Sequence, residues 1–153
     1  MGVYKDHIKD ALPSIKKVRD LKKKLESKGV KYIYSNWIDF LGSPKTKPMP
    51  ISDFEDLCMG KGPQFAVHSV SFVPELTPAD NDQIPVPDLD SLMICPWDKT
   101  CAWVFADLYW NDRPYDVCPR LTLKKQIQKS AKSDLKFYVG IEPEFFLMKW
   151  EGD

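Results

Sequence analysis

Apolar residues recur at intervals of three and four over residues 10–28, and this spacing predicts an α-helix. The apolar stripe consists of Leu12, Ile15, Val18, Leu21 and Leu25. Asp10 suits the N-cap, Pro13 is tolerated in the first turn, and Gly29 suits the end of the helix. The Lys-rich opposite face is interpreted as a solvated surface rather than a phosphate-binding patch.

The next part of the chain has the pattern of a small β-rich unit. Tyr, Ile and Trp over residues 30–40 predict a strand, and the turn signal at Gly42-Ser43-Pro44 predicts a return strand over 45–49. Residues 52–59 are predicted as a short helix that a capping box, Ser52-Asp53-Phe54-Glu55, would open. Further extended segments are predicted at 62–72, 91–95 and 101–110.

Residues 74–90 are expected to form a stiff loop, because five prolines fall in this short stretch and proline cannot donate to a ladder. The loop also carries acidic residues, namely Glu75, Asp80, Asp82, Asp88 and Asp90. Their spacing matches no calcium-binding loop, and they are interpreted as polar turn caps.

After a boundary predicted near residues 112–119 the pattern becomes helix, then strand. Pro119 suits the first position of a helix to about Lys132, with Leu121, Leu123, Ile127 and Ala131 as its apolar positions. Residues 135–147 are predicted as a strand. Its residues Glu142 and Glu144 would project from one face roughly 6.5 Å apart, against an apolar opposite face. Two neighbouring carboxylates suit a pair of hard divalent cations, one ligand to each, with the other ligands coming from elsewhere.

Composition narrows the class of protein. The chain has 153 residues, and its hydrophobic fraction of 43% describes a folded globular protein rather than a disordered one. Lys plus Arg and Asp plus Glu both number 22, and this balance argues against nucleic acid as the main partner. No apolar stretch approaches the length of a membrane span and no signal peptide is visible, so a cytoplasmic location is expected.

Four cysteines, Cys58, Cys95, Cys101 and Cys118, are scattered without a CxxC pair. We interpret them as reduced, small hydrophobic residues rather than as zinc ligands or disulfides.

Five short motifs in this order resemble the N-terminal part of a glutamine synthetase. They are Asp82, Pro87-Asp88, Pro96-Trp97, Pro119-Arg120 with Leu123-Lys124-Lys125-Gln126-Ile127, and Gly140-Ile141-Glu142-Pro143-Glu144-Phe145-Phe146. The resemblance covers nearly the whole chain from about Lys28. Thr77-Pro78-Ala79-Asp80 and the Trp-rich strand resemble the type III branch, which includes γ-glutamylmethylamide synthetases.

The resemblance implies an α+β fold. It would comprise an N-terminal helix over 1–29, a β-grasp-like N-terminal domain over 30–112, and the beginning of the catalytic domain, helix plus strand, over 113–153. It implies an enzyme that cleaves ATP to form γ-glutamyl phosphate, from which ammonia or an amine displaces phosphate. Glu142 would belong to the Mg²⁺ or Mn²⁺ site that holds the ATP phosphates, and Glu144 to the metal site nearer glutamate. The whole enzyme would be a ring-shaped homo-oligomer, and the acidic loop would face a neighbouring subunit's site. There Asp82 would either help to bind ammonium or position the closing loop, or it would be a structural cap.

Two departures from the family pattern matter. The family's ammonium-binding Asp, which follows a Phe, is replaced by Ala66 in the run Phe65-Ala66-Val67-His68-Ser69. This raises doubt about ammonia as the acceptor and is compatible with an amine, and His68 is either a substitute base or a structural residue. The rest of the catalytic barrel is absent from the sequence, so the chain alone is expected to be inactive.

An alternative function is a non-catalytic module that docks with full-length glutamine synthetase subunits or regulates them. The predicted strand over 135–147 argues against it, because a free-standing module would expose an apolar face and an unpaired edge.

Overall fold

The computed structural model describes residues 2–67 and 76–152, and it begins with two short helices rather than one. Helix α1 spans Ile8–Ala11 and α2 spans Ile15–Ser27. The Ser14 side chain accepts a hydrogen bond from the Lys17 backbone N–H and caps α2. The prediction of one helix capped by Asp10 was therefore wrong at its start, because Pro13 separates the two helices and Ser14 provides the cap.

The sheet is mixed, with one long strand in contact with four others. Its strands are β1 (Tyr32–Ile38), β2 (Pro44–Pro50), β3 (Ile84–Pro87), β4 (Met93–Ile94), β5 (Cys101–Trp110) and β6 (Arg113–Pro114). The order is β2-β1-β5-β3, and β4 and β6 also pair with β5. β1 and β5 are parallel, whereas the other pairs are antiparallel. The predicted hairpin of β1 and β2 and the predicted strand over 101–110 are confirmed.

Strand β3 contradicts the prediction that residues 74–90 form no ladder. It lies at the end of the sheet and pairs with β5, with Val86 opposite Asp107. The Asp88 N–H donates to the Phe105 carbonyl of β5 at 2.8 Å. Because backbone N–H groups alternate in direction along a strand, the nitrogen atoms of every second residue, counted back from Asp88, also point toward β5. Pro85 and Pro87 therefore turn their nitrogens away from β5, where a missing N–H costs no ladder bond.

Two other predicted elements differ in detail. Residues 52–59 divide into a 3-10 turn, η1 (Ile51–Asp53), and α3 (Phe54–Cys58), and the capping box does not form because the Ser52 hydroxyl donates to Asp53 instead. The strand predicted at 91–95 is reduced to β4, since η2 (Leu89–Ser91) occupies its beginning. In the segment predicted over 62–72, Phe65 forms one bridge with Gln83, and residues 68–72, including His68, lie outside the described part.

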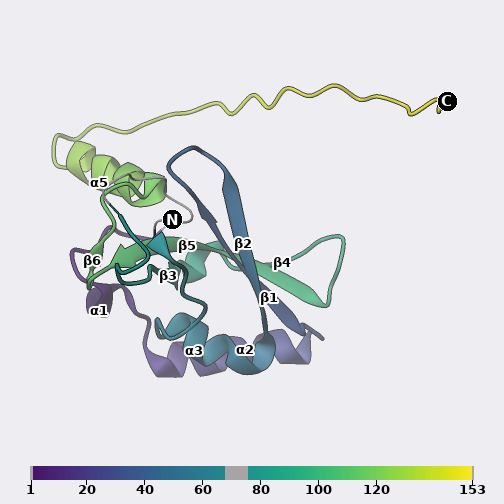
Figure 1. The fold of residues 1–153 in the computed structure, drawn as a ribbon, viewed down its shortest axis with the longest axis horizontal. Helices are drawn as coiled ribbons and strands as arrows, with labels where there is room; N and C mark the ends of the chain where they lie inside the picture. Colours follow the sequence, from purple (N-terminus) through teal and green to yellow (C-terminus); the bar gives the residue numbers. More distant parts are fainter. Residues whose placement is uncertain (1, 68–75, 153) are drawn as a thin grey trace.

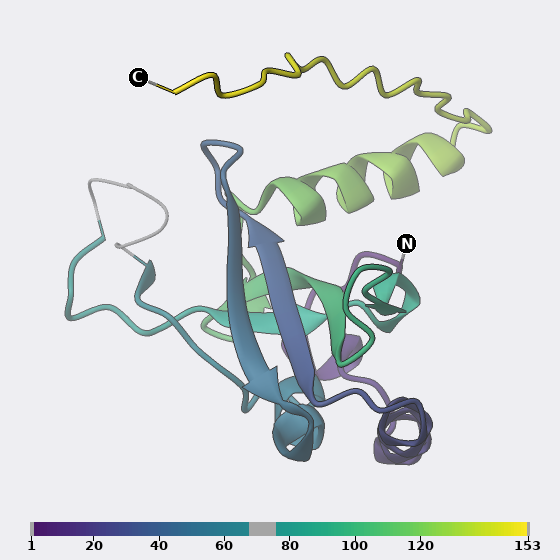
Figure 2. The same ribbon diagram turned by 90° about the vertical axis from the view of Figure 1, so that its right-hand side faces the viewer.

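Two apolar clusters pack the fold. The first joins α2 and α3 to one face of β1 and β5, with Val18, Ile33, Phe54, Leu57 and Val104 at its centre. The second joins the far half of β5 to β3 and the start of helix α5 (Pro119–Ala131), with Trp37, Val86, Leu108, Tyr109 and Leu121 among its members. Figures 1 and 2 accordingly show α2 and α3 together at one end of the molecule and α5 at the other.

Helix α5 begins at Pro119 as predicted, but its buried face differs from the prediction. Leu121 and Lys124 are buried, whereas Leu123 and Ile127 are exposed. Lys124 points inward because the carboxylates of Asp88 and Asp107 bind it there. This orientation of the helix places Leu123 and Ile127 on its outer face.

Residues 135–152 form no strand, contrary to the prediction for 135–147. The segment is extended and exposed; after α5 it turns back and passes over the molecule, separate from the body (Figures 1 and 2). A strand requires a hydrogen-bonded neighbour, and no other described segment lies beside this one. None of the described helices is long and apolar enough to cross a membrane.

Candidate functional site

Glu142 and Glu144 both lie in the extended segment after α5. Both side chains are exposed, and neither forms a hydrogen bond or ion pair with another described residue. No group of three or more potential metal-binding side chains occurs among the described residues. The two carboxylates are thus available to hard cations, but the part of the chain that the structure describes places no further ligand beside them.

Asp82, the third candidate residue, lies in a different part of the molecule. It is exposed and directly precedes Gln83, which exchanges two backbone hydrogen bonds with Phe65. This bridge brings Asp82 and Ala66 onto adjacent antiparallel segments. The structure does not bring Asp82 together with Glu142 or Glu144.

A cluster of four charged side chains, three of them buried and Arg120 partly buried, holds the start of α5 against the sheet. Asp88 follows β3, Asp107 lies in β5, and Arg120 and Lys124 lie in the first turns of α5. Lys124 Nζ lies 3.0 Å from Asp88 Oδ2, and Arg120 Nε lies 3.0 Å from Asp107 Oδ1. Arg120 also contacts Asp88, and Lys124 also contacts Asp107, so each cation serves both carboxylates.

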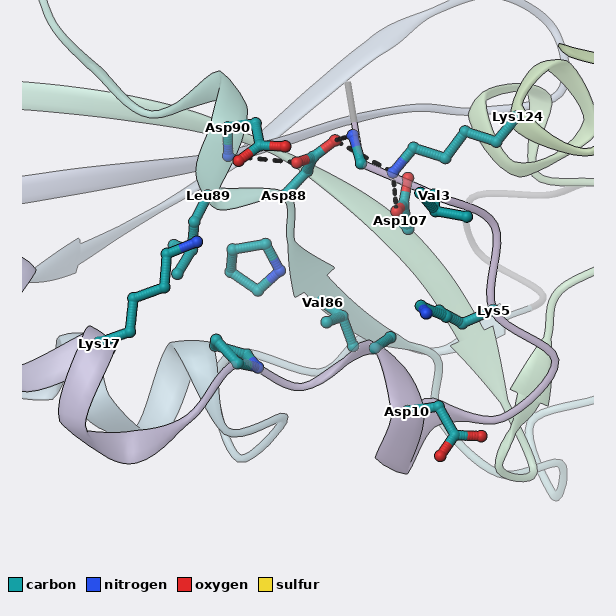
Figure 3. A pocket seen from close by; sticks show the side chains of 14 residues that line it. Val3, Lys5, Asp10, Lys17, Val86, Asp88, Leu89, Asp90, Asp107 and Lys124 are labelled. Carbon is teal, nitrogen blue, oxygen red and sulfur yellow. Dashed lines mark hydrogen bonds and ion pairs between the residues drawn. The ribbon is translucent and has the colours of Figure 1, made fainter. Parts of the chain in front are cut away.

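Asp88 has two further partners. The backbone N–H of Gly2 donates to its Oδ2 at 2.9 Å, and the N–H of Asp90 donates to Oδ1 at 3.2 Å. Figure 3 shows these groups converging at the rim of a cleft of about 200 Å³ between the N-terminal segment and the sheet. Burial raises the pKa of Asp88, but the Gly2 and Lys124 hydrogen bonds and the charges of Lys124 and Arg120 outweigh it and lower the pKa to about 2.

This cluster has a structural role rather than a catalytic or metal-binding one. Its carboxylates are already neutralised by two cations, so they offer neither a free base nor an open site for a metal ion. What the cluster does is fix the position of α5, and therefore the place from which residues 135–152 leave the body.

Asp88, Arg120 and Lys124 all belong to the motifs found in the sequence, but the sequence did not predict that their side chains form ion pairs with one another. Lys124 lies three residues after the buried Leu121 and hence on the same helix face, which was the available signal. Asp107, the alternate partner, stands in an otherwise apolar run of β5, where an isolated acid commonly has a buried partner.

Comparison with known proteins connects these features to one family. Residues 116–153 match the family model described as the glutamine synthetase catalytic domain. A glutamine synthetase of Rhizobium meliloti is 37% identical over 133 residues, which make up 87% of this chain and 30% of that protein. A glutamate–methylamine ligase of Methyloversatilis universalis is 31% identical over 127 residues, which make up 82% of this chain and 28% of that protein.

Solved structures give the same picture. The structure titled "GmaS/ADP complex-Conformation 1" matches with a TM-score of 0.68 and 30% identity over 75% of this chain and 26% of the other. A second, "Apo GmaS without ligand", matches with a TM-score of 0.69 and 30% identity over 75% of this chain and 27% of the other. The chain thus spans less than a third of the length of the relatives that it matches.

The ion cluster yields a prediction for stability. Lys124→Met keeps much of the buried stem but leaves Asp88 and Asp107 with one cation between them, so we expect the free energy of unfolding to fall by about 3 kcal/mol. Urea unfolding followed by circular dichroism measures the change. Lys129→Met, an exposed change in the last turn of the same helix, should cost less than about 0.5 kcal/mol. Equal effects of the two substitutions would contradict the assigned role of Lys124.

Acid should destabilise the fold through Asp88. Its folded pKa of about 2 lies below the ordinary value of 3.8, so its contribution is complete above pH 3.8 and is lost as the pH falls toward 2. The shift corresponds to about 2 kcal/mol. Unfolding midpoints of the wild type and Asp88→Asn between pH 5 and pH 2 test this, because the variant should be less stable at pH 5 and show a weaker pH dependence. Parallel pH curves for the two proteins would rule out Asp88 as the group that titrates.

Proposed function

Because this chain belongs to the glutamine synthetase family, a family of ligases, we propose that it forms the front part of an ATP-dependent ligase that joins glutamate to ammonia or an amine through γ-glutamyl phosphate. One observation carries this proposal. Glu142 and Glu144 fall inside residues 116–153, the part that matches the catalytic-domain model. The chain alone is then expected to be inactive, since among the described residues no third metal-binding side chain lies beside Glu142 and Glu144.

Residues 30–112 would be a β-grasp-like domain, and residues 113–153 would begin the catalytic domain. The mixed sheet supports this division, because α2 and α3 cover one face of β1 and β5, whereas α5 contacts β5 from the opposite face through Asp107. The buried ion cluster would then be the joint between the two domains, with Asp88 and Asp107 on one side and Arg120 and Lys124 on the other.

Glu142 would hold the divalent ion that binds the ATP phosphates, and Glu144 the ion nearer glutamate. Carboxylate oxygens are the ligands that Mg²⁺ and Mn²⁺ prefer. Both side chains are exposed, and neither has a hydrogen-bond or ion-pair partner among the described residues. Bound divalent ions neutralise the charge that develops during phosphoryl transfer. If residues 135–147 pair into a strand in the whole protein, Glu142 and Glu144 would project from the same face of that strand and hold two ions side by side.

Exposed apolar side chains support a missing sheet partner for residues 135–152. Val139 and Ile141 on one face are 79% and 87% exposed, and Phe146 on the other is 93% exposed. Leu123 and Ile127 on the outer face of α5 are exposed as well. Such a surface is far larger than a stable monomer leaves in water. Further catalytic-domain strands would cover it, and this need argues against the alternative of a free-standing, non-catalytic docking module.

Asp82 would bind the cationic form of the nitrogen donor. Ala66 offers only a methyl group, whereas Asp82 lies on the adjacent segment with its carboxylate exposed and without a described partner. The whole protein would be a cytoplasmic, ring-shaped homo-oligomer in which Asp82 faces a neighbouring subunit's site. A relative that is a glutamate–methylamine ligase supports an amine as one possible acceptor, and the glutamine synthetase relatives support ammonia.

Glu142→Ala and Glu144→Ala test the metal assignment in the natural polypeptide that carries this chain. Each should lower kcat for ATP-dependent amide formation by about 100-fold or more, because a lost ligand removes roughly 3 kcal/mol of transition-state stabilisation. Glu151→Ala, in the same exposed segment, is the matched control and should retain wild-type turnover. Wild-type turnover in either of the two test variants would refute the assignment, and calorimetric titration with Mn²⁺ separates lost metal from misfolding.

Asp82→Asn tests the acceptor site independently. The KM for the nitrogen donor should rise about tenfold while the KM for ATP stays unchanged, because the substitution removes one charge-assisted hydrogen bond. Asp116→Asn, another exposed aspartate, is the control. An unchanged KM for both ammonia and methylamine would leave Asp82 with the role of a turn cap.

A further inference from the structure

The hairpin of β4 and β5 places two cysteines directly opposite each other. Met93 pairs with Trp103 and Ile94 with Ala102, so the next pair in this register is Cys95 with Cys101. The Cys95 N–H donates to the Cys101 carbonyl at 2.9 Å and confirms that pairing. Side chains of directly opposed residues project from the same face of an antiparallel ladder.

This arrangement suits a disulfide. Directly opposed residues of an antiparallel ladder have Cα atoms about 4.5–5.5 Å apart. Disulfides span Cα separations of about 4.4–6.8 Å, so the backbone needs no rearrangement. We propose that Cys95 and Cys101 are a modification site, a dithiol that a small-molecule disulfide oxidises to an intrachain disulfide across the β4–β5 hairpin.

An oxidant could reach the pair only through a cleft of about 290 Å³ on the face of the sheet opposite α2 and α3. Cys95 and Cys101 are themselves buried, with 3% and 7% of their surface exposed, but both thiols are free and both residues line this cleft together with Trp97 and Trp103. Cys58 and Cys118, by contrast, are fully buried in the two separate apolar clusters, where neither has a second thiol as a neighbour.

The reaction balances with glutathione disulfide as the oxidant. One protein thiolate attacks a glutathione sulfur, forms a mixed disulfide and releases one glutathione thiolate. The second protein thiolate then attacks the protein sulfur of that mixed disulfide and releases the second glutathione. Two electrons pass to glutathione disulfide, and the two thiol protons leave to solvent and the released thiolates.

Neighbouring groups favour the protonated thiol of Cys95. Burial raises the pKa of Cys95, the adjacent Cys101 and the Asp98 carboxylate raise it further, and Lys99 opposes them weakly. Tyr34 of β1 faces Cys101, and the Cys101 thiol donates to Asp98 Oδ2 at 3.3 Å. Disulfide formation removes this thiol donor from Asp98 and fixes the base of the loop that carries the exposed Trp97.

Peptide mapping of the wild type tests the proposal without any substitution. The protein is incubated with glutathione disulfide at about pH 8.5, where thiolate forms; remaining thiols are alkylated, and trypsin is added. Trypsin cuts after Lys99, so residues 62–99 and 100–120 should appear as one linked species that separates on reduction. Tandem mass spectrometry assigns the link to Cys101 rather than Cys118, which shares the second peptide.

Two variants sharpen the assignment. Cys118→Ala should keep the linked species, whereas Cys101→Ser should abolish it. If both cysteines of the wild type remain alkylatable, carry separate glutathione adducts, or link to Cys58 or Cys118 in the folded protein, the proposal is wrong. It does not depend on the proposed ligase function, and neither result affects the other.

Discussion

Four clustered charges determine how this chain is put together. Asp88 and Asp107 come from the sheet and Arg120 and Lys124 from α5, and each cation reaches both carboxylates. Moving such ions out of water costs several kcal/mol apiece, and their mutual attraction returns roughly that amount, so the net gain in stability is small. Losing one member costs far more, because an unpaired charge remains inside. The cluster therefore specifies one position for α5 more than it stabilises the fold, and Gly2, bound to Asp88, is fixed by the same group.

Strand β5 connects the ion cluster to the rest of the fold. It pairs with β1, β3, β4 and β6, so its two ends serve different purposes. One end, from Ala106 to Trp110, carries the ion cluster and the second apolar cluster, and turns back into β6 through Asn111 and Asp112, whose positive φ angles suit a two-residue hairpin turn. The other end begins at Cys101, opposite Cys95, beside the open cleft. The ion cluster and the opposed cysteine pair thus lie at opposite ends of β5.

Much of this arrangement could be predicted from local patterns. Period and composition indicated β1, β2, β5 and α5, and motif order indicated the family, because these signals lie within short windows of sequence. The failures involve pairing across the chain. β3 was missed because proline content excludes a ladder in general but not where the nitrogens of Pro85 and Pro87 face outward at an edge. The inward face of α5 was misread because Lys124 is buried by Asp88 and Asp107, which are distant in sequence, and the opposed cysteines became visible only with the register of β4 and β5.

The difference between local patterns and pairing across the chain also explains why Glu142 and Glu144 could be identified as candidate metal ligands while the other groups of a metal site could not. Two carboxylates about 6.5 Å apart repel by roughly 0.6 kcal/mol in water but by roughly 2.5 kcal/mol at an effective dielectric constant of 20. In the exposed segment water removes this cost, and Glu142 and Glu144 need no partner. Packing the apolar side chains around them into a sheet would lower the local dielectric constant and bring the repulsion back unless cations came with it. Under the proposed function, covering Val139, Ile141 and Phe146 and binding divalent ions would therefore be coupled steps. A local sequence pattern can indicate the two carboxylates without containing the other groups that such a site needs.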